Sequence, residues 1–148
     1  MISQTAEYAL RAVVFLAMNP DRAFTTQQIS RGTRVPAPYL SKVLQSVVRA
    51  GLVHSSRGIG GGFLLAKPAD VISILSVVQA VDPIQRIREC PLGIPSHGAN
   101  LCALHKRLDD ASALMEKVFD DTTITELLSH PTRSTPLCDG PPKTVSTE

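Results

Sequence analysis

The stretch VPAPYLSKVLQSVVRAGLVHSSRGIGGGFLLAK, residues 35–67, joins a helical pattern directly to a β-hairpin pattern. Prolines open the helical part, and Gly51 stands where a left-handed helix cap is expected. Two short strand-like runs then flank the turn RGIGG at 57–61, whose glycines permit positive φ. The stretch therefore predicts a hairpin preceded by an amphipathic helix, with its apolar stripe at Leu40, Val43, Leu44, Val47 and Val48.

Two further helices are predicted upstream of this stretch. In residues 3–18 apolar side chains recur three and four apart until Asn19-Pro20 ends the pattern. A second helix begins at a Thr25–Gln28 pair with capping-box spacing, and Gly32 is expected to end it. Two short helices joined by a tight turn and followed by a hairpin are typical of a winged helix-turn-helix. The predicted fold class is mainly α-helical with a small β-hairpin wing.

Downstream of the wing, the sequence divides into four parts. An apolar helix over 70–82 is expected to complete a winged-helix domain over 1–82, and a loop over 83–100 carries Cys90. A dimerisation helix and a short C-terminal helix are expected over 101–130, followed by a tail over 131–148 that is too polar to order itself. The long helix begins at Leu101 and carries a heptad-like seam at Leu101, Leu104, Leu108, Ala111, Met115 and Val118. A second copy is the simplest partner for this seam, and packing against its own domain is the alternative.

Composition excludes several classes of protein. The 148 residues are 43% hydrophobic and 19% charged, as in an ordinary globular domain with an appended element. No apolar run approaches the ~20 residues that span a bilayer, and the N-terminus lacks the pattern of a signal peptide. Three cysteines, an odd number, favour reduced thiols over a disulfide scaffold. We therefore expect a cytoplasmic protein with no membrane partner.

The charge is distributed unevenly along the chain, although its net value is only +2. Residues 22–69 contain no Asp or Glu and seven Lys and Arg, whereas residues 70–148 contain seven basic and eleven acidic residues. A basic module of this kind is typical of a polyanion-binding domain, and chance charge on a solvated face is the alternative. Because the chain has no Trp and only 4% aromatic residues, stacking on single strands is not expected. Double-stranded DNA is the predicted partner.

The predicted third helix and the wing carry most of the candidate DNA contacts. Ser41, Lys42 and Gln45 lie off the apolar stripe, where a recognition helix meets base edges and phosphates. Arg57 leads into the wing turn, where a guanidinium can enter an adjacent minor groove. The Thr25–Thr26 pair begins a helix, whose free N–H groups favour a phosphate. Solvated surface is the alternative for Ser41 and Gln45. The candidate DNA-binding residues are Thr25, Thr26, Pro38, Tyr39, Ser41, Lys42, Gln45, Arg49, Arg57, Gly58, Gly60 and Gly61.

Six motifs follow one another in unbroken order over roughly residues 2–128: EYALRAVVFLA, VPAPYLSKVLQSVVRAGLV, SSRGIGGGFLLAKP, VVQAVD, LCALH and TTITELL. Together they resemble the IscR/NsrR family of bacterial winged-helix transcription regulators, and the arginine–glycine wing is the specific signal. The resemblance implies homodimers on near-palindromic operators, with the long helix as the dimer seam. Many members hold an iron–sulfur cluster whose loss or redox change alters DNA affinity, whereas others work through a thiol or a partner protein. Some members have Glu where this sequence has Ser41, so a cluster-switched choice between two operator types is not implied here.

Two cysteines and two histidines surround the start of the long helix. Cys102 and His105 are three residues apart on one predicted helix face and can reach a common metal. The family resemblance implies more: cluster-binding members have three cysteines with five residues between neighbours, and Cys90 and Cys102 fit the outer pair while Ser96 takes the middle position. It also implies an acidic ligand from the first helix of the partner subunit, where this sequence has Glu7. The implied metal ligands, for a [2Fe–2S] cluster, are Cys90, Cys102, Glu7 and His105.

Each of these ligands has a second interpretation. Glu7 has the spacing to pair with Arg11 on its own helix. His105 can be solvated or can pair with Asp109, and His97 in the loop is another candidate ligand. The thiols can also act without any metal, as a disulfide or thiol sensor.

Two regulatory functions follow from these alternatives. The first is a DNA-binding regulator, expected to be a repressor, whose operator affinity depends on an iron–sulfur cluster near the dimer interface. The second is a cluster-free repressor controlled by a Cys90–Cys102 disulfide or by a partner protein. An enzyme that uses Cys102 and His105 is not predicted, and no small-molecule substrate is expected, because the sequence shows no oxyanion loop and no third orienting residue. No spacing connects Cys138 to the other two cysteines.

Overall fold

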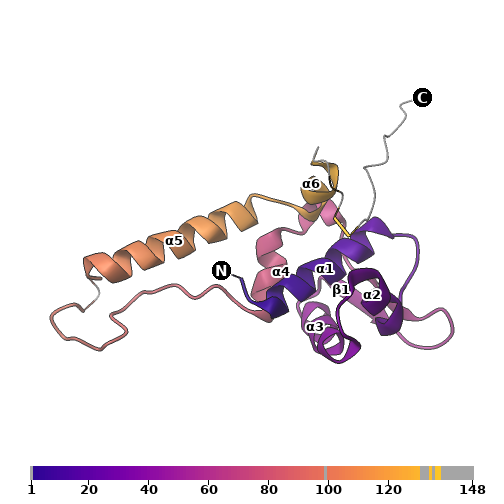
Figure 1. Cartoon of the computed structure of the whole chain (residues 1–148), viewed down its shortest axis with the longest axis horizontal. Helices are drawn as coiled ribbons and strands as arrows, with labels where there is room; N and C mark the ends of the chain where they lie inside the picture. The colour runs from indigo at the N-terminus through magenta and orange to yellow at the C-terminus, as the bar shows by residue number, and fades with distance from the viewer. Residues whose placement is uncertain (1, 99, 131–133, 135, 138–148) are drawn as a thin grey trace.

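Three helices and a two-stranded hairpin form the winged-helix part of the chain (Figure 1). The computed structural model describes residues 2–98, 100–130, 134, 136 and 137. The predicted fold class is confirmed by the elements α1 (Gln4–Met18), α2 (Thr26–Thr33), α3 (Ala37–Arg49), β1 (Val53–Ser56) and β2 (Gly62–Leu65).

The helix starts follow from local side-chain chemistry. The Ser3 hydroxyl accepts a hydrogen bond from the Ala6 N–H at 3.2 Å and caps α1. At α2 the predicted capping box is confirmed: the Thr25 N–H donates to Gln28 Oε1 at 2.9 Å, and the Gln28 N–H donates to Thr25 Oγ1 at 3.3 Å. Both starts are therefore specified within four residues of sequence.

Gly32 does not end α2 as predicted. The helix continues to Thr33, and Arg34 adopts the left-handed conformation with φ 56°. Gly32 instead allows α1 to come close, because a Cβ at this position would lie 2.2 Å from Cε2 of Phe15. Gly32 thus serves helix–helix packing, whereas the local sequence pattern had indicated that it ends the helix.

The wing is fixed to the helices through Phe24. Strands β1 and β2 pair antiparallel, with Val53 opposite Leu65. The Phe24 N–H donates to the Phe63 carbonyl at 2.9 Å, and the Phe63 N–H donates back at 2.8 Å. Phe24, just before α2, therefore pairs with β2 as a single-residue bridge. This bridge holds the wing against the helix-turn-helix.

The segment 70–82 is only partly the helix that the sequence predicts. A 3₁₀ turn over Ala69–Val71 comes first, and α4 spans Ile74–Val81 with the Ser73 hydroxyl as its cap. Ile72 then adopts an extended conformation and pairs with the start of the short helix α6 (Ile124–Ser129): the Ile124 N–H donates to the Ile72 carbonyl at 2.9 Å. The predicted Thr123–Glu126 capping box of α6 is confirmed.

Helix α5 (Ala103–Asp120) begins two residues later than predicted. Cys102 occupies its N-cap position with extended backbone, so Leu101 lies outside the helix and the predicted seam starts at Leu104. Figure 1 shows α5 projecting from the winged-helix part, with the 83–98 segment running alongside to its far end. No residue of α5 is fully buried within its own subunit, in contrast to α1 and α3.

The core lies between α1, α3, α4 and the base of the wing. Its fully buried side chains include Leu16, Leu40, Leu44, Val77 and Ile124. Of the predicted tail, 131–148, only Ser134, Pro136 and Leu137 are among the described residues, and Leu137 packs against this core; the rest lies outside them. Within the described part of the chain, no helix is both long and apolar enough to cross a membrane.

Candidate DNA-binding surface and thiol site

Helix α3 separates its apolar and polar residues onto two faces. Leu40, Val43, Leu44 and Val47 are buried against α1 and α4. The opposite face is open to solvent, and all six candidate residues of this helix lie on it: Pro38, Tyr39, Ser41, Lys42, Gln45 and Arg49. The Ser41 hydroxyl donates to the Ala37 carbonyl at 3.1 Å, so its proton is engaged within the helix and its oxygen faces outward. The exposed face of α3 therefore carries these candidate residues along the whole length of the helix.

The start of α2 offers less to a ligand than the sequence implied. Thr25 is exposed, but its side-chain oxygen already accepts the Gln28 N–H and its own N–H is taken by the Gln28 side chain. Thr26 is half-buried. The capping box therefore engages the N–H groups of Thr25 and Gln28, which a phosphate would otherwise use, and leaves the Thr25 hydroxyl proton able to donate.

The wing turn exposes one cation and one apolar side chain. Gly58 and Gly60 have φ of 91° and 76°, and the Gly61 N–H closes the turn onto the Gly58 carbonyl at 3.0 Å. Arg57 is exposed at the start of this turn, and Ile59 at its tip is fully exposed. Sequence analysis did not single out Ile59, because an isolated apolar residue among glycines has no pattern around it.

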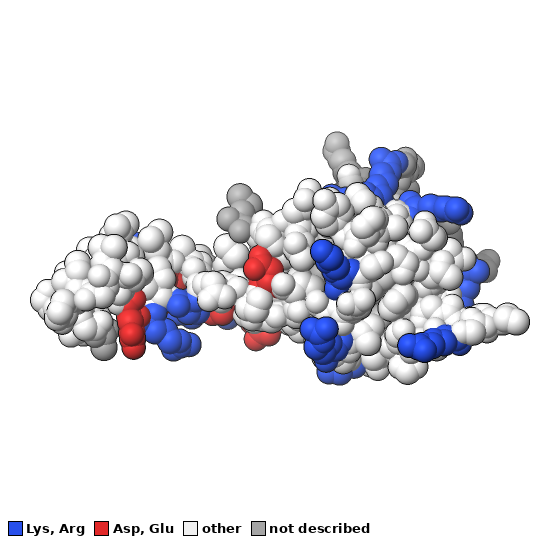
Figure 2. Space-filling view, turned by 90° about the horizontal axis from the view of Figure 1, so that it is seen from below, with Lys and Arg blue, Asp and Glu red and all other residues white. Residues whose placement is uncertain are grey.

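The electrostatics of this side of the molecule match the uneven charge of the sequence. Figure 2 views the molecule from below, the side on which α3 lies in Figure 1. Lys and Arg side chains are spread over the compact winged-helix end, whereas the visible Asp and Glu side chains gather toward the middle and the α5 end. This face therefore presents a positive field with no carboxylates seen among the cations of its winged-helix end.

The two described cysteines each contact one imidazole. Cys90 Sγ lies 3.6 Å from His97 Nδ1, and Cys102 Sγ lies 3.4 Å from His105 Nδ1. Both thiols are free and half-buried. The Cys102–His105 contact has the spacing that the sequence predicted. The Cys90–His97 contact joins two residues of the loop, which makes His97 part of the thiol surroundings.

No single group of ligands is assembled around these thiols. Among the residues that the structure describes in this one subunit, no three His, Cys, Asp or Glu side chains lie together in a metal-holding arrangement. Glu7 accepts hydrogen bonds from the Arg11 guanidinium, at 3.0 Å from Nε and more closely from Nη2. The thiol and imidazole donors are chemically suited to iron or zinc, but one subunit brings them together only in pairs.

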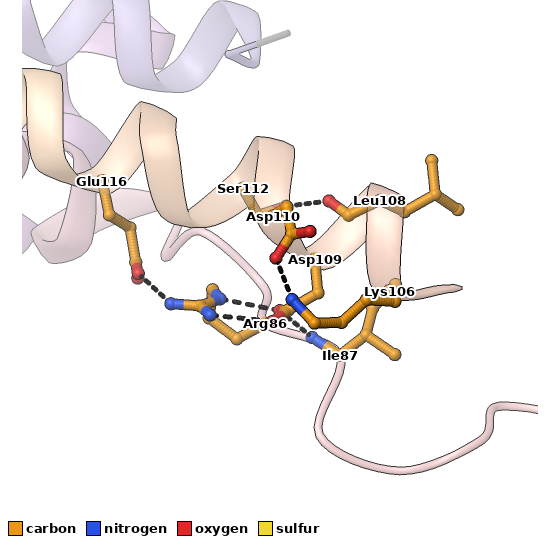
Figure 3. Close-up of polar contacts among 8 residues, drawn as sticks. All are labelled: Arg86, Ile87, Lys106, Leu108, Asp109, Asp110, Ser112 and Glu116. Atoms are coloured by element: carbon orange, nitrogen blue, oxygen red, sulfur yellow. Dashed lines mark hydrogen bonds and ion pairs between the residues drawn. The ribbon is translucent and has the colours of Figure 1, made fainter. Parts of the chain in front are cut away.

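An arginine in the loop is held by two carboxylates of α5, and sequence analysis missed this cluster (Figure 3). Arg86 donates to both oxygens of Asp109, at 2.7 and 2.8 Å, and to Glu116 at 3.0 Å. The Ile87 N–H donates to Asp109 at 2.9 Å. These hydrogen bonds, above all the one from Arg86, lower the pKa of Asp109 from 3.8 to about 2. Asp109 is therefore the partner of Arg86 and does not pair with His105.

Comparison with known proteins places the chain in a family. Residues 2–130 match the Rrf2 family, described as iron-dependent transcriptional regulators. The chain belongs to the Rrf2 family. This result confirms the predicted membership among winged-helix transcription regulators, since IscR-type proteins are among the relatives that the chain matches.

Two relatives of this Rrf2-family chain are similar over most of their length. An HTH-type transcriptional regulator of Aquifex aeolicus (strain VF5) is 30% identical over 132 residues, which cover 87% of this chain and 92% of the relative. IscR of Yersinia pseudotuberculosis is 28% identical over 130 residues, which cover 87% of this chain and 79% of the relative. These relatives are transcriptional regulators rather than enzymes.

Among solved structures, CymR, the global cysteine regulator of B. subtilis, shares the fold. Its TM-score is 0.72 at 22% identity, and the match covers 89% of this chain and 98% of CymR. The family is described by iron dependence, whereas this structural neighbour is named for cysteine regulation, and its likeness to this chain is one of fold.

The Arg86–Asp109 contact predicts an acid titration. Because the pKa of Asp109 in the folded protein is below its ordinary value, the contact stabilises the fold above about pH 4 and is lost as the pH falls toward 2. We expect the carboxyl resonance of Asp109, followed by NMR, to titrate with a midpoint near 2. In Arg86→Gln the midpoint should move toward 3.8, whereas in Arg88→Gln it should not move. The same midpoint in wild type and Arg86→Gln would contradict the assignment.

Proposed function

We propose that this Rrf2-family regulator is a homodimeric repressor that binds operator DNA through α3 and the wing, and that a group bound at Cys90 and Cys102 modulates its affinity. The observation that carries the DNA-binding surface is the solvent face of α3, which continues the acid-free, Lys- and Arg-bearing surface over residues 22–69. Side chains of this type, on a helix supported by a buried apolar stripe, suit the major groove.

Each part of this surface has a distinct chemical task. Gln45 and Lys42 offer donors and acceptors to base edges, while Arg49 at the helix end suits a phosphate. Arg57 lies at the base of a turn tight enough to enter a minor groove, where narrow A·T-rich segments concentrate negative potential. The capping box engages the N–H groups of Thr25 and Gln28, so a phosphate at the predicted contacts Thr25 and Thr26 would have fewer donors than the bare start of a helix offers.

Exposed apolar side chains on α5 support the homodimer. Leu104, Leu108 and Val118 are between 50% and 64% exposed, and they recur at the spacing of a coiled-coil seam. A helix of 18 residues with such a seam and no buried residue is unfavourable in water without a partner. Pairing of two α5 helices would bring two copies of α3 into one dimer, so that each copy could bind one half-site. The two half-sites of an operator lie about one DNA turn (~34 Å) apart.

The donor chemistry around the thiols fits a [2Fe–2S] cluster shared between subunits. Cys90 and Cys102 would supply thiolates, and His105 an imidazole, because its ring already lies beside Cys102. Glu7 of the partner subunit would complete the set, at the cost of its exposed ion pair with Arg11, which is a weak interaction. His97 is the alternative fourth donor because it contacts Cys90. When bound, such a group supplies a redox-sensitive and removable bridge between the loop, α5 and the partner.

The second candidate function keeps DNA binding and dispenses with the cluster. Both thiols are free, half-buried and next to an imidazole, which suits oxidation to a disulfide or a small thiol adduct. CymR of B. subtilis is named a cysteine regulator and shares this fold. In this case the loop would respond to the redox state or to a partner protein rather than to iron.

DNA binding by the wing is tested with Arg57→Ala. Loss of one guanidinium from the minor groove should lower operator affinity about tenfold and reduce the slope of log affinity against log salt by about one. The measurement is fluorescence anisotropy of a labelled operator, selected from genomic fragments, at several salt concentrations. Lys117→Ala, which removes a cation from α5 away from this face, should leave both values unchanged. Equal operator affinities for wild type, Arg57→Ala and Lys117→Ala would contradict a contact between Arg57 in the wing and the operator.

The dimer is tested with Leu108→Glu. A carboxylate in the seam should be expelled from an apolar interface, so the variant should sediment as a folded monomer. Operator affinity should fall by at least ~100-fold, because the two half-sites no longer act together. Lys117→Glu adds a carboxylate to the opposite side of α5 and should remain dimeric. A dimeric Leu108→Glu variant would contradict the seam as the interface.

The two regulatory inputs are separated by the absorption spectrum of anaerobically purified protein. A cluster predicts visible absorbance with matching iron and sulfide, its loss in air, and its absence in Cys90→Ser and Cys102→Ser. Cys138→Ser is the matched control and should keep the absorbance. Colourless, iron-free protein whose operator affinity still responds to oxidant would instead establish the cluster-free function.

A further inference from the structure

The Arg86 cluster joins the two segments that carry the cysteines. Arg86 lies four residues before Cys90 in the loop, and Asp109 lies seven residues after Cys102 on α5. Four residues of extended chain span at most ~14 Å, and seven residues of helix rise ~10 Å. The contact between Arg86 and Asp109 therefore limits how far Cys90 can lie from α5.

The other hydrogen bonds of the described loop residues, 83–98, do not reach α5. Its turns are closed internally, by the Gly93 N–H on the Cys90 carbonyl at 3.0 Å and by the His97 N–H on the Ile94 carbonyl at 3.0 Å. Among the described residues, every hydrogen bond between the 83–98 segment and α5 ends on Asp109 or Glu116. The cluster is thus the polar attachment of this part of the loop to the helix.

We propose that Arg86 is a positioning residue, which anchors the loop on α5 and so limits how far Cys90 can move from the helix that begins at Cys102. The proposal deepens the proposed function, because it matters only if these two thiols form one sensing site. Arginine suits the task because its planar fork meets both oxygens of Asp109 while a third nitrogen reaches Glu116. The contact is partly shielded from water, with side-chain exposures of 30% for Arg86 and 14% for Asp109.

The anchor occupies a different side of α5 from the proposed dimer seam. Asp109 and Glu116 are seven residues apart and therefore share one face. Asp109 follows Leu108 directly, which places it about 100° around the helix from the seam. Figure 3 shows Arg86 approaching these carboxylates from the loop side of the helix. Removing the anchor should therefore alter the loop without disturbing pairing of the seams.

The test compares Arg86→Gln with Arg88→Gln in the full-length, reduced, chelator-treated protein. Arg88 is an exposed arginine of the same loop outside the cluster, so both variants lose one positive charge. The measurements are the alkylation rates of Cys90 and Cys102 by iodoacetamide, resolved by peptide mass spectrometry, and hydrogen exchange at the Ile87 amide. Circular dichroism and sedimentation report whether each variant folds and assembles as wild type does.

We expect Arg86→Gln to raise the Cys90 alkylation rate and the Ile87 exchange rate about tenfold, because local opening of the loop no longer breaks a charge-assisted contact. Cys102 should react at its wild-type rate, since α5 holds it independently. Arg86→Lys, which keeps the charge but not the fork, should give a smaller rise. Arg88→Gln should match wild type.

Wild-type rates in Arg86→Gln, or an equal rise in Arg88→Gln, would overturn the proposal. If Arg86→Gln does not fold, Asp109→Asn provides the same readout, because its amide oxygen still accepts the Ile87 N–H while the charge that holds Arg86 is gone. The alkylation and hydrogen-exchange rates can be read whether or not the proposed function is correct. Failure of every variant and of wild type to bind operator DNA would overturn that function, yet it would leave the alkylation rates to decide the role of Arg86.

Discussion

The close packing of α1 is the constraint on which the rest of this molecule depends. Ala6, Ala9 and Ala12 are fully buried, and their small side chains let α3, α4 and α6 approach one backbone closely. Gly32 continues the same principle at α2, where the Phe15 ring takes the place of a Cβ. Because α1 is inside, α3 must turn its apolar stripe inward and its polar face to solvent. The exposed polar face of α3 is thus a consequence of how the first helix is covered.

Helix α5 obeys the opposite rule, since its subunit covers none of its residues fully. It is held at its C-terminal end by the link between Ile72 and Ile124 and along its length by Arg86. A helix attached by polar contacts on one side keeps its apolar seam available for another molecule. The same polar contacts bring the thiol loop to it. On the proposed function, assembly and sensing therefore use two sides of one helix.

Sequence patterns predicted well wherever the cause was local. Both capping boxes and the Cys102–His105 contact join residues three apart, so the letters that specify them lie together. The start of α4 was misplaced because Ile72, directly before its N-cap residue, is held in an extended conformation by Ile124, some fifty residues later. The Arg86 cluster was missed for the same reason: Asp109 and Glu116 form a simple pattern, but nothing in the sequence selects an arginine more than twenty residues upstream. Contacts between residues that lie far apart in the sequence can be identified only once the fold is known.

The fold also suggests how an event at the thiols would reach the DNA surface. Helix α4 packs against α1, α3 and α5, so it connects α5 to α3 through direct contacts. Half-sites on DNA are fixed at multiples of its turn, so a small change in how two α5 helices pair would misplace the two copies of α3 relative to each other. A ligand at the thiols then needs only a different affinity for two dimer geometries, because that difference sets how far it can shift operator binding. On the proposed function, the sensor acts on the spacing between subunits, and the recognition helix itself can remain rigid.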